Sequence, residues 1–178
     1  MSINALTVFC GSKNGSNSIY EEHAANLGRI LAKHNIKLVY GGGNKGLMSA
    51  VANAVLAGGG HVTGIIPKVL TEWEHQHNGL TELLVVEDMH TRKKLLYEKS
   101  DAAIILPGGY GTLDEMFEML TWNQLSLHNK HIFILNTAGF YNHLITHIEQ
   151  MMQEEFLYET IEKRMTILST PDQLEQYL

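Results

Sequence analysis

The feature that most limits the folds open to this chain is an apolar run that leads into a glycine-rich turn and then into an amphipathic helix. The run covers residues 102–106, and Pro-Gly-Gly-Tyr-Gly follows at 107–111. Pro107 ends the expected strand because it offers no N–H to a sheet ladder. Glycines let the backbone turn tightly and let a ligand approach closely. The turn and the helix N-terminus favour anion binding, because free N–H groups and the helix dipole meet there.

Short apolar runs alternate with helical stripes along the whole chain. Strands are expected at residues 6–10, 36–40, 62–66, 83–86, 102–106, 132–135 and 165–168. Ser18 with Glu21 fits a capping box at the start of the first helix. The alternation predicts an α/β fold, a doubly wound parallel sheet in a Rossmann-like three-layer sandwich with right-handed crossovers. No linker or repeat interrupts the 178 residues, so one domain is expected over 1–178.

Composition excludes several classes of protein. The formal net charge is −6 at pH 7, which argues against a nucleic-acid partner because duplex binding requires a basic face. A small anionic ligand stays compatible, since a local pocket can oppose the global sign. Cys10 is the single cysteine, so no internal disulfide forms. The N-terminus lacks signal-peptide features and no apolar run is long enough to span a membrane, so a soluble cytoplasmic protein is expected.

Glycine-rich turns follow the first, second and fifth expected strands, at residues 11–16, 41–46 and 107–111. In a parallel sheet these turns lie at one edge, where ligands bind at the reversal of strand order. We therefore expect one pocket built from all three turns. The second turn also matches the dinucleotide fingerprint G-x-G-x-x-G, but no acidic residue follows at the position that would hold a ribose. A tight turn needed only for packing is the alternative explanation of that match.

Three cations, Arg92, Lys93 and Lys94, fall in the first turns of an expected helix, the end where the dipole disfavours positive charge. For Lys94 we favour a solvated surface. For Arg92 and Lys93 an anion held nearby explains the placement better, since the arginine fork suits phosphate or carboxylate. Glu115 lies close to the same expected anion site. Either it takes part in the chemistry or it forms a capping box with Thr112, and the residues alone leave both open.

Other polar side chains have simpler interpretations. His143 and His147 are spaced i, i+4, which can bind a metal, but no third ligand is evident and an exposed helix face is favoured. Cys10 follows a strand near the expected pocket and is interpreted as core packing. The alternation of strand and helix patterns is absent over residues 68–81, so a long loop is expected there. The loop contains Trp73 and two histidines, His75 and His77, which either line the pocket or only cover the surface.

The motifs together resemble those of the LOG (Lonely Guy) family, the cytokinin riboside 5′-monophosphate phosphoribohydrolases, long labelled lysine decarboxylases. The Arg92-Lys93 pair combined with Pro-Gly-Gly-x-Gly-Thr-x-x-Glu at 107–115 is the most specific feature. Further matching segments are Cys10-Gly11-Ser12, Tyr40-Gly41-Gly42-Gly43, Gly46-Leu47-Met48, Ile66-Pro67-Lys68, Met89-His90, Thr121-Trp122 and Gln124-Leu125. The loop at 68–81 matches poorly.

The resemblance implies hydrolysis of the N-glycosidic bond of an adenosine 5′-monophosphate, with or without an N6 substituent, to free base and ribose 5-phosphate. Arg92 and Glu115 would be the catalytic pair, and the carboxylate would stabilise oxocarbenium-like charge and orient a water. Gly108, Gly109, Gly111 and Thr112 would cradle the phosphate. The other implied substrate-binding residues are Gly11, Ser12, Gly42, Gly43, Met89, Lys93, Tyr110 and Thr121. The family further implies a homodimer that needs no metal and no organic cofactor.

A non-catalytic nucleotide-binding or sensing module of the same fold is the alternative function. The joint presence of Arg92 and Glu115 favours the enzyme, because simple binding does not require both. A lysine decarboxylase would need a lysine that forms a Schiff base with pyridoxal phosphate, and the sequence singles out no such lysine. The identity of the released base is left open by the sequence.

Overall fold

The computed structural model describes residues 3–71, 75–158 and 160–178, so Trp73 lies outside the described residues. The strands are β1 (Ala5–Phe9), β2 (Lys37–Tyr40), β3 (Val62–Pro67), β4 (Glu82–Val86), β5 (Ala102–Ile105), β6 (Ile132–Leu135) and β7 (Met165–Leu168). The α-helices are α1 (Ile19–Lys33), α2 (Gly46–Ala57), α3 (Met89–Glu98), α4 (Tyr110–Gln124) and α5 (Asn142–Gln153). The 3₁₀ helices are η1 (Lys68–Leu70), η2 (Thr137–Gly139), η3 (Ile161–Lys163) and η4 (Pro171–Tyr177).

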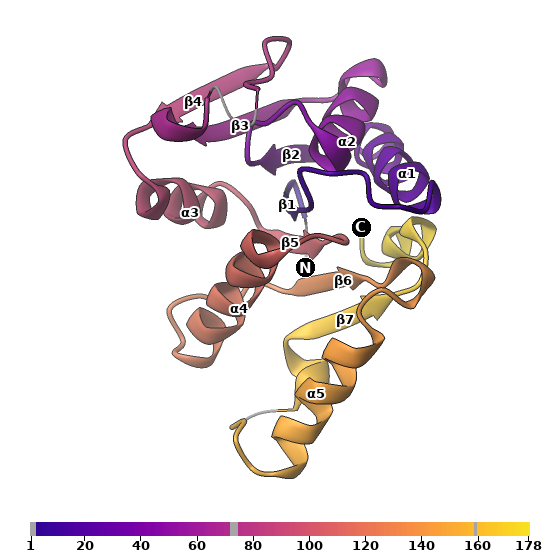
Figure 1. Cartoon of the computed structure of the whole chain (residues 1–178), viewed down its shortest axis with the longest axis vertical. Helices are drawn as coiled ribbons and strands as arrows, with labels where there is room; N and C mark the ends of the chain where they lie inside the picture. The colour runs from indigo at the N-terminus through magenta and orange to yellow at the C-terminus, as the bar shows by residue number, and fades with distance from the viewer. Residues whose placement is uncertain (1–2, 72–74, 159) are drawn as a thin grey trace.

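The strands form one parallel sheet in the order β4-β3-β2-β1-β5-β6-β7 (Figure 1). The chain adds strands outward from β1 on one side as far as β4, and then returns to place β5, β6 and β7 on the other side. The predicted doubly wound parallel sheet is confirmed. Its reversal point lies between β1 and β5, which is where such sheets bind ligands.

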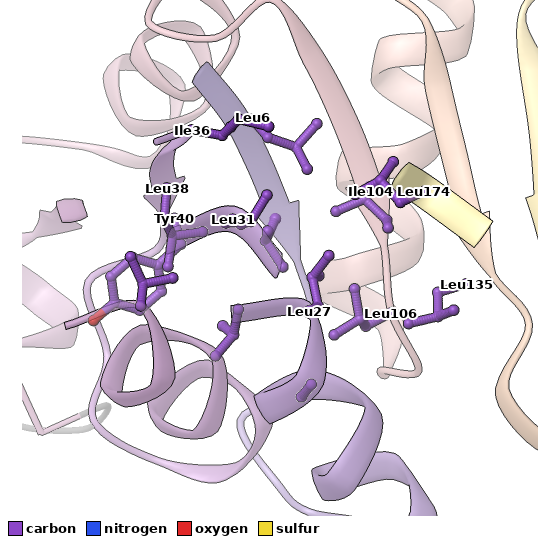
Figure 2. Packing of buried hydrophobic residues seen from close by; sticks show 14 of the residues in the cluster. Leu6, Leu27, Leu31, Ile36, Leu38, Tyr40, Ile104, Leu106, Leu135 and Leu174 are labelled. Carbon is purple, nitrogen blue, oxygen red and sulfur yellow. The ribbon is translucent and has the colours of Figure 1, made fainter. Parts of the chain in front are cut away.

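Two apolar clusters, one on each face of the sheet, hold the layers together. Side chains alternate along each strand, so Val8 of β1 belongs to the first cluster and Phe9 to the second. The first cluster joins the sheet to α1, α2 and η4, and the second joins it to α3, α4 and α5. Figure 2 shows part of the first cluster, which contains Leu27 and Leu31 of α1 and Leu6 of β1. Burial of each such leucine stabilises the fold by roughly 1.5–3 kcal/mol relative to exposure.

The start of α1 differs from the expected capping box. Ser18 has helical dihedral angles, φ −58° and ψ −25°, and its hydroxyl makes no capping hydrogen bond to the helix. The backbone N–H of Ile19 instead donates to Asn17 Oδ1 at 3.1 Å, and the Glu21 carboxylate accepts from Asn14 Nδ2 at 2.9 Å. The prediction was wrong because an asparagine one residue earlier reaches the free amide.

The remaining helix ends follow simple local rules. Gly58 caps the end of α2, a position where glycine is common. Pro171 opens the last helix, a 3₁₀ segment, where Thr170 and Gln173 form a reciprocal capping box. Within the described ranges, none of the helices is both long and apolar enough to cross a bilayer.

Candidate active site

A cavity of about 440 Å³ lies beyond the carboxyl ends of the central strands. As expected, the turns after β1, β2 and β5 all contribute to it. Its lining includes Cys10, Gly11, Ser12, Gly41, Met48, Leu70, Met89, Arg92, Gly109, Tyr110, Gly111, Thr112, Asp114 and Glu115. The sequence analysis did not assign Met48 or Leu70 of this lining to the site, although Met48 belongs to one of the matching segments. Met48 lies on a helical stripe that resembles ordinary core, and Leu70 lies in the loop without a pattern.

The three turns are locked to one another by backbone contacts. Gly11 N–H donates to Pro107 O at 3.0 Å, and Leu47 N–H donates to Gly11 O at 3.1 Å. Gly46 has φ +57°, and a Cβ there would lie 2.3 Å from Lys13 N. The turn after β1 is therefore held between the other two, and the glycine at 46 is required by this close approach.

The turn before α4 uses its glycines in two ways. A Cβ on Gly108 would lie 2.1 Å from Thr112 Oγ1, whereas a Cβ on Gly109 or Gly111 would meet nothing within 4 Å. Gly108 lines a neighbouring cavity of about 400 Å³ that shares Gly11 and Gly109 with the main one. Packing thus requires Gly108, while Gly109 and Gly111 leave open space at the N-terminus of α4, where the free N–H groups of the first turn favour an anion.

Arg92 lines the cavity and is otherwise buried, with 5% of its surface exposed. Its Nε donates to Ile65 O at 3.1 Å, and its Nη2 donates to Gly41 O at 2.9 Å. These carbonyls lie on β3 and just after β2, so the guanidinium joins α3 to the edge of the sheet. A Cβ on Gly41 would lie 2.1 Å from Nη2, which explains the glycine there. Met89, one turn earlier on α3, lies with its Sδ 3.9 Å from Nη1.

Lys93 has a different environment from its neighbour. Its Nζ lies 2.6 Å from Glu118 Oε2 and 3.1 Å from Asp114 Oδ2. Burial alone would lower the pKa of Lys93, but the hydrogen bonds with these two carboxylates outweigh it and raise the pKa above its ordinary value. Lys93 is not among the described residues that line the cavity. The anions beside it are the protein's own carboxylates. Lys94 is exposed, as expected, and pairs loosely with Glu98 at 3.7 Å.

Glu115 lies on α4 and lines the same cavity as Arg92. The N-cap of α4 is Gly109, so the residue at the N-cap makes no side-chain capping hydrogen bond. Thr112 is therefore already inside the helix, so the alternative of a Thr112–Glu115 capping box was wrong. Asp114 also lines the cavity, although its carboxylate is paired with Lys93. Tyr110 stands at the rim with 95% of its surface exposed.

Besides Lys93 and Gly108, three further implied substrate-binding residues do not line this cavity: Gly42, Gly43 and Thr121. The turn formed by Gly42 and Gly43 is paired with the loop instead: His77 N–H donates to Gly42 O at 3.0 Å, and Gly43 bridges Gln76. Thr121 donates its hydroxyl to Phe117 O at 2.7 Å and lines a separate apolar cavity of about 150 Å³. The structure thus brings together most of the implied site but places these residues elsewhere.

The histidines are not gathered at the cavity in the described part of the chain. His77 is buried, with Nε2 2.9 Å from Asn53 Oδ1. His143 and His147 are exposed on α5, as expected. Among the described residues, no group of three or more His, Cys, Asp or Glu side chains could hold a metal ion. Cys10 is half-buried and packs against the first apolar cluster while also lining the cavity.

The fold and the cavity define a Rossmann-like α/β protein with a cavity at its strand reversal, where sheets of this kind bind ligands. A molybdenum cofactor binding protein from Rippkaea orientalis has the same fold at a TM-score of 0.73 and 21% identity, covering 99% of this chain and 96% of the other. The molybdenum cofactor carrier protein of Chlamydomonas reinhardtii is similar at a TM-score of 0.72 and 16% identity, covering 98% of each chain. At these identities the likeness concerns the fold alone.

Sequence comparison gives the family. A family model described as "Possible lysine decarboxylase" matches residues 48–178. The cytokinin riboside 5′-monophosphate phosphoribohydrolase LOG3 of Arabidopsis thaliana is 47% identical over 166 residues, covering 93% of this chain and 76% of the relative. The enzyme of that name from Rhodococcoides fascians is 46% identical over 164 residues, covering 92% and 83%. The chain belongs to the LOG family of cytokinin riboside 5′-monophosphate phosphoribohydrolases.

Proposed function

We propose that this protein hydrolyses the N-glycosidic bond of a nucleoside 5′-monophosphate and releases the free base and ribose 5-phosphate. Adenosine 5′-monophosphate, with or without an N6 substituent, is the substrate class. The observation that carries the proposal is that Arg92 of α3 and Glu115 of α4 line one cavity, which also contains the open N-terminus of α4. The relatives that share this chain's sequence are named for the same reaction on cytokinin ribotides.

Glu115 carries the chemical step. As the bond between the base and the ribose C1′ breaks, the base leaves with the bonding electrons and positive charge develops on the sugar. The carboxylate stabilises that charge and orients a water, which attacks C1′ and gives up a proton. The departing base takes up a proton, so the sum of the reaction is the addition of one water across the bond.

The phosphate contributes positioning rather than chemistry. The first-turn N–H groups of α4 and the positive end of its dipole face the space left open by Gly109 and Gly111. Phosphate bound there fixes the nucleotide, and binding energy from this remote group holds the scissile bond near Glu115. Arg92 contributes a fixed positive charge at the same cavity, because backbone carbonyls hold its guanidinium in place.

A lysine decarboxylase activity does not fit this cavity. Such an enzyme forms a Schiff base between a lysine and pyridoxal phosphate. No lysine is found among the described residues that line the main cavity. The two carboxylates that surround Lys93 also keep that ammonium charged, which opposes its use as a nucleophile.

We further infer that the protein is a homodimer that associates through the surface around the second half of α4. Phe117 and Tyr158 line the apolar cavity there and are 37% and 89% exposed. Leu125 and Leu127, just after α4, are 63% and 66% exposed. Large apolar side chains gathered on one surface favour association, and a second copy of the chain would cover them.

The experiment that tests the reaction is incubation of the protein with AMP and with isopentenyl-AMP, followed by chromatography of the free base. Adenosine, which lacks the phosphate, is the matched control. We expect base release from at least one of the monophosphates and much slower release from adenosine. Binding of the nucleotides without release from either would instead support the nucleotide-binding module.

A further inference from the structure

A polar network joins α3 to α4 beside the cavity. Glu118 of α4 is its centre, because Oε2 lies 2.6 Å from Lys93 Nζ and accepts the Tyr97 hydroxyl at 3.1 Å. The side chains of Lys93 and Glu118 are only 14% and 20% exposed. Asp114 adds a second carboxylate 3.1 Å from Lys93. Two donors from α3 therefore converge on one carboxylate of α4.

Tyr97 is the rigid member of this network. Its ring is buried between two aromatic neighbours, with ring centroids 4.7 Å from Trp122 and 6.1 Å from Phe9. Burial, followed by the charge and hydrogen bond of Glu118, raises the pKa of the Tyr97 hydroxyl, which therefore remains a donor. The same hydroxyl lies 3.4 Å from the backbone carbonyl of Glu115. The network thus reaches the backbone of the proposed catalytic carboxylate.

The network completes a frame that holds the two proposed catalytic side chains. Arg92 precedes Lys93 on α3 and is anchored to the sheet by the carbonyls of Ile65 and Gly41. Glu115 is one helical turn before Glu118 on α4. Anchoring Glu118 to α3 therefore ties the position of Glu115 to that of Arg92. A displacement of about 1 Å at a reacting group can cost about a hundredfold in rate.

The charges around Lys93 also argue against a phosphate ligand for it. Two carboxylates occupy two directions of its ammonium, and the local sum of charge is negative when both are ionised. A phosphate brought to Lys93 would have to approach these carboxylates, and like charges at close range repel. The N-terminus of α4, with open space at Gly109 and Gly111, presents a site without this penalty.

We propose that Lys93, Tyr97 and Glu118 are positioning residues that fix Glu115 relative to Arg92, and that Lys93 acts through Glu118 rather than through the substrate phosphate. The inference rests on the proposed function. It assigns Lys93 a role other than the nucleotide contact implied by the sequence resemblance.

The test compares Lys93→Met, Glu118→Gln and the double variant in steady-state base release from AMP, with Lys94→Met as the matched control. Each single variant should lower kcat by roughly tenfold to a hundredfold while KM stays within about twofold, the pattern of a lost orienting contact. The double variant should be no slower than the slower single variant, because both changes break one link. Lys93→Arg should recover part of the lost kcat, and Lys94→Met should behave as wild type.

The opposite pattern overturns the inference. If Lys93 contacts the phosphate, Lys93→Met raises KM for AMP, narrows the preference for AMP over adenosine, and adds to the effect of Glu118→Gln. Circular dichroism spectra of all variants identify any that fail to fold, and Tyr97→Phe then serves as the milder test of the same link. If wild type releases no base, the proposed function fails. Calorimetric titration of Lys93→Met with AMP then decides the role of Lys93, because affinity that falls tenfold or more contradicts the inference and unchanged affinity supports it.

Discussion

Two glycines three residues apart, Gly108 and Gly111, show how one residue type serves packing at one position and ligand space at another. A Cβ on Gly108 would meet Thr112 Oγ1 at 2.1 Å and Gly11 N at 3.0 Å. A Cβ on Gly111 would point into open space at the start of α4. The sequence motif contains both glycines and gives no means of separating their roles, since the difference arises from what the fold places opposite each.

We predict opposite effects of alanine at these two positions. Gly108→Ala should lower the free energy of unfolding by roughly 1–3 kcal/mol through overpacking. Gly111→Ala should leave stability unchanged or raise it by up to about 1 kcal/mol, because alanine favours the helix. It should nevertheless weaken AMP binding, since the new methyl group occupies the proposed phosphate space. Urea denaturation and calorimetric titration measure the two effects. Wild-type affinity in Gly111→Ala would show that the phosphate lies elsewhere.

At the scale of elements, one buried histidine fastens the loop after β3 to α2 and to the turn after β2. His77 Nε2 lies 2.9 Å from Asn53 Oδ1 of α2, while Nδ1 accepts the N–H of Gly79 at 3.1 Å. The ring is therefore neutral and carries its proton on Nε2. Burial lowers the pKa of His77 from its ordinary value of 6.5. The hydrogen bonds of His77 therefore hold this part of the loop against α2 and against the turn after β2.

This arrangement predicts that acid weakens the fold. Below pH 6.5 the unfolded chain binds a proton at His77 that the folded chain does not yet bind. The contribution of neutral His77 to the free energy of unfolding is therefore fully present above pH 6.5. It is lost as the pH falls toward and through the lowered pKa of His77 in the folded state. His77→Gln, whose amide can still donate to Asn53, should show a smaller loss between pH 7.5 and 5.5 in denaturant titrations. Burial also lowers the pKa values of His23, His128 and His131. The variant therefore removes only the part of the acid-induced loss of stability that comes from His77. An equal loss in both proteins would contradict the assignment.

The elements themselves were largely predictable from the sequence, whereas the cap of α1 and the polar contacts between helices were not. Apolar runs bounded by glycine and proline gave the seven strands to within one or two residues, because those residues have strong local preferences. The cap of α1 was missed because Asn17 and Ser18 are both good capping residues and local spacing does not choose between them. The carboxylates around Lys93 were missed because Glu118 reaches it only once α3 and α4 are assembled on the sheet.

At the scale of the whole molecule, the sheet order explains why the candidate site could be anticipated. Parallel strands bring the turns after β1, β2 and β5 to one edge, so three glycine motifs distant in sequence meet at a single cavity. Thr121 shows the limit of the same reasoning. It belongs to a motif of the family, yet it lies on α4 beside the apolar cavity rather than the main one. Which cavity a helical residue faces depends on the packing of that helix, which a motif does not encode.

The apolar surface around the end of α4 predicts the state of association. We expect a mass near twice the 20.0 kDa of one chain in light scattering coupled to gel filtration. Leu125→Asp should shift the protein toward monomer, because a carboxylate buried in an apolar interface is costly. Val69→Asp changes a similarly exposed side chain in η1, which is not part of the apolar surface defined above, and should leave the mass unchanged. A monomeric wild type, or a shift caused only by Val69→Asp, would refute this interface.

The central claim is that Glu115 breaks the bond between base and sugar within the cavity it shares with Arg92. Its most direct test is Glu115→Gln, which keeps the size and polarity of the side chain and removes its charge. Free base released from AMP should fall by at least about a hundredfold, while AMP affinity measured by calorimetry stays within about twofold of wild type. Turnover that persists at the wild-type rate in Glu115→Gln would contradict the account and remove this carboxylate from the chemistry.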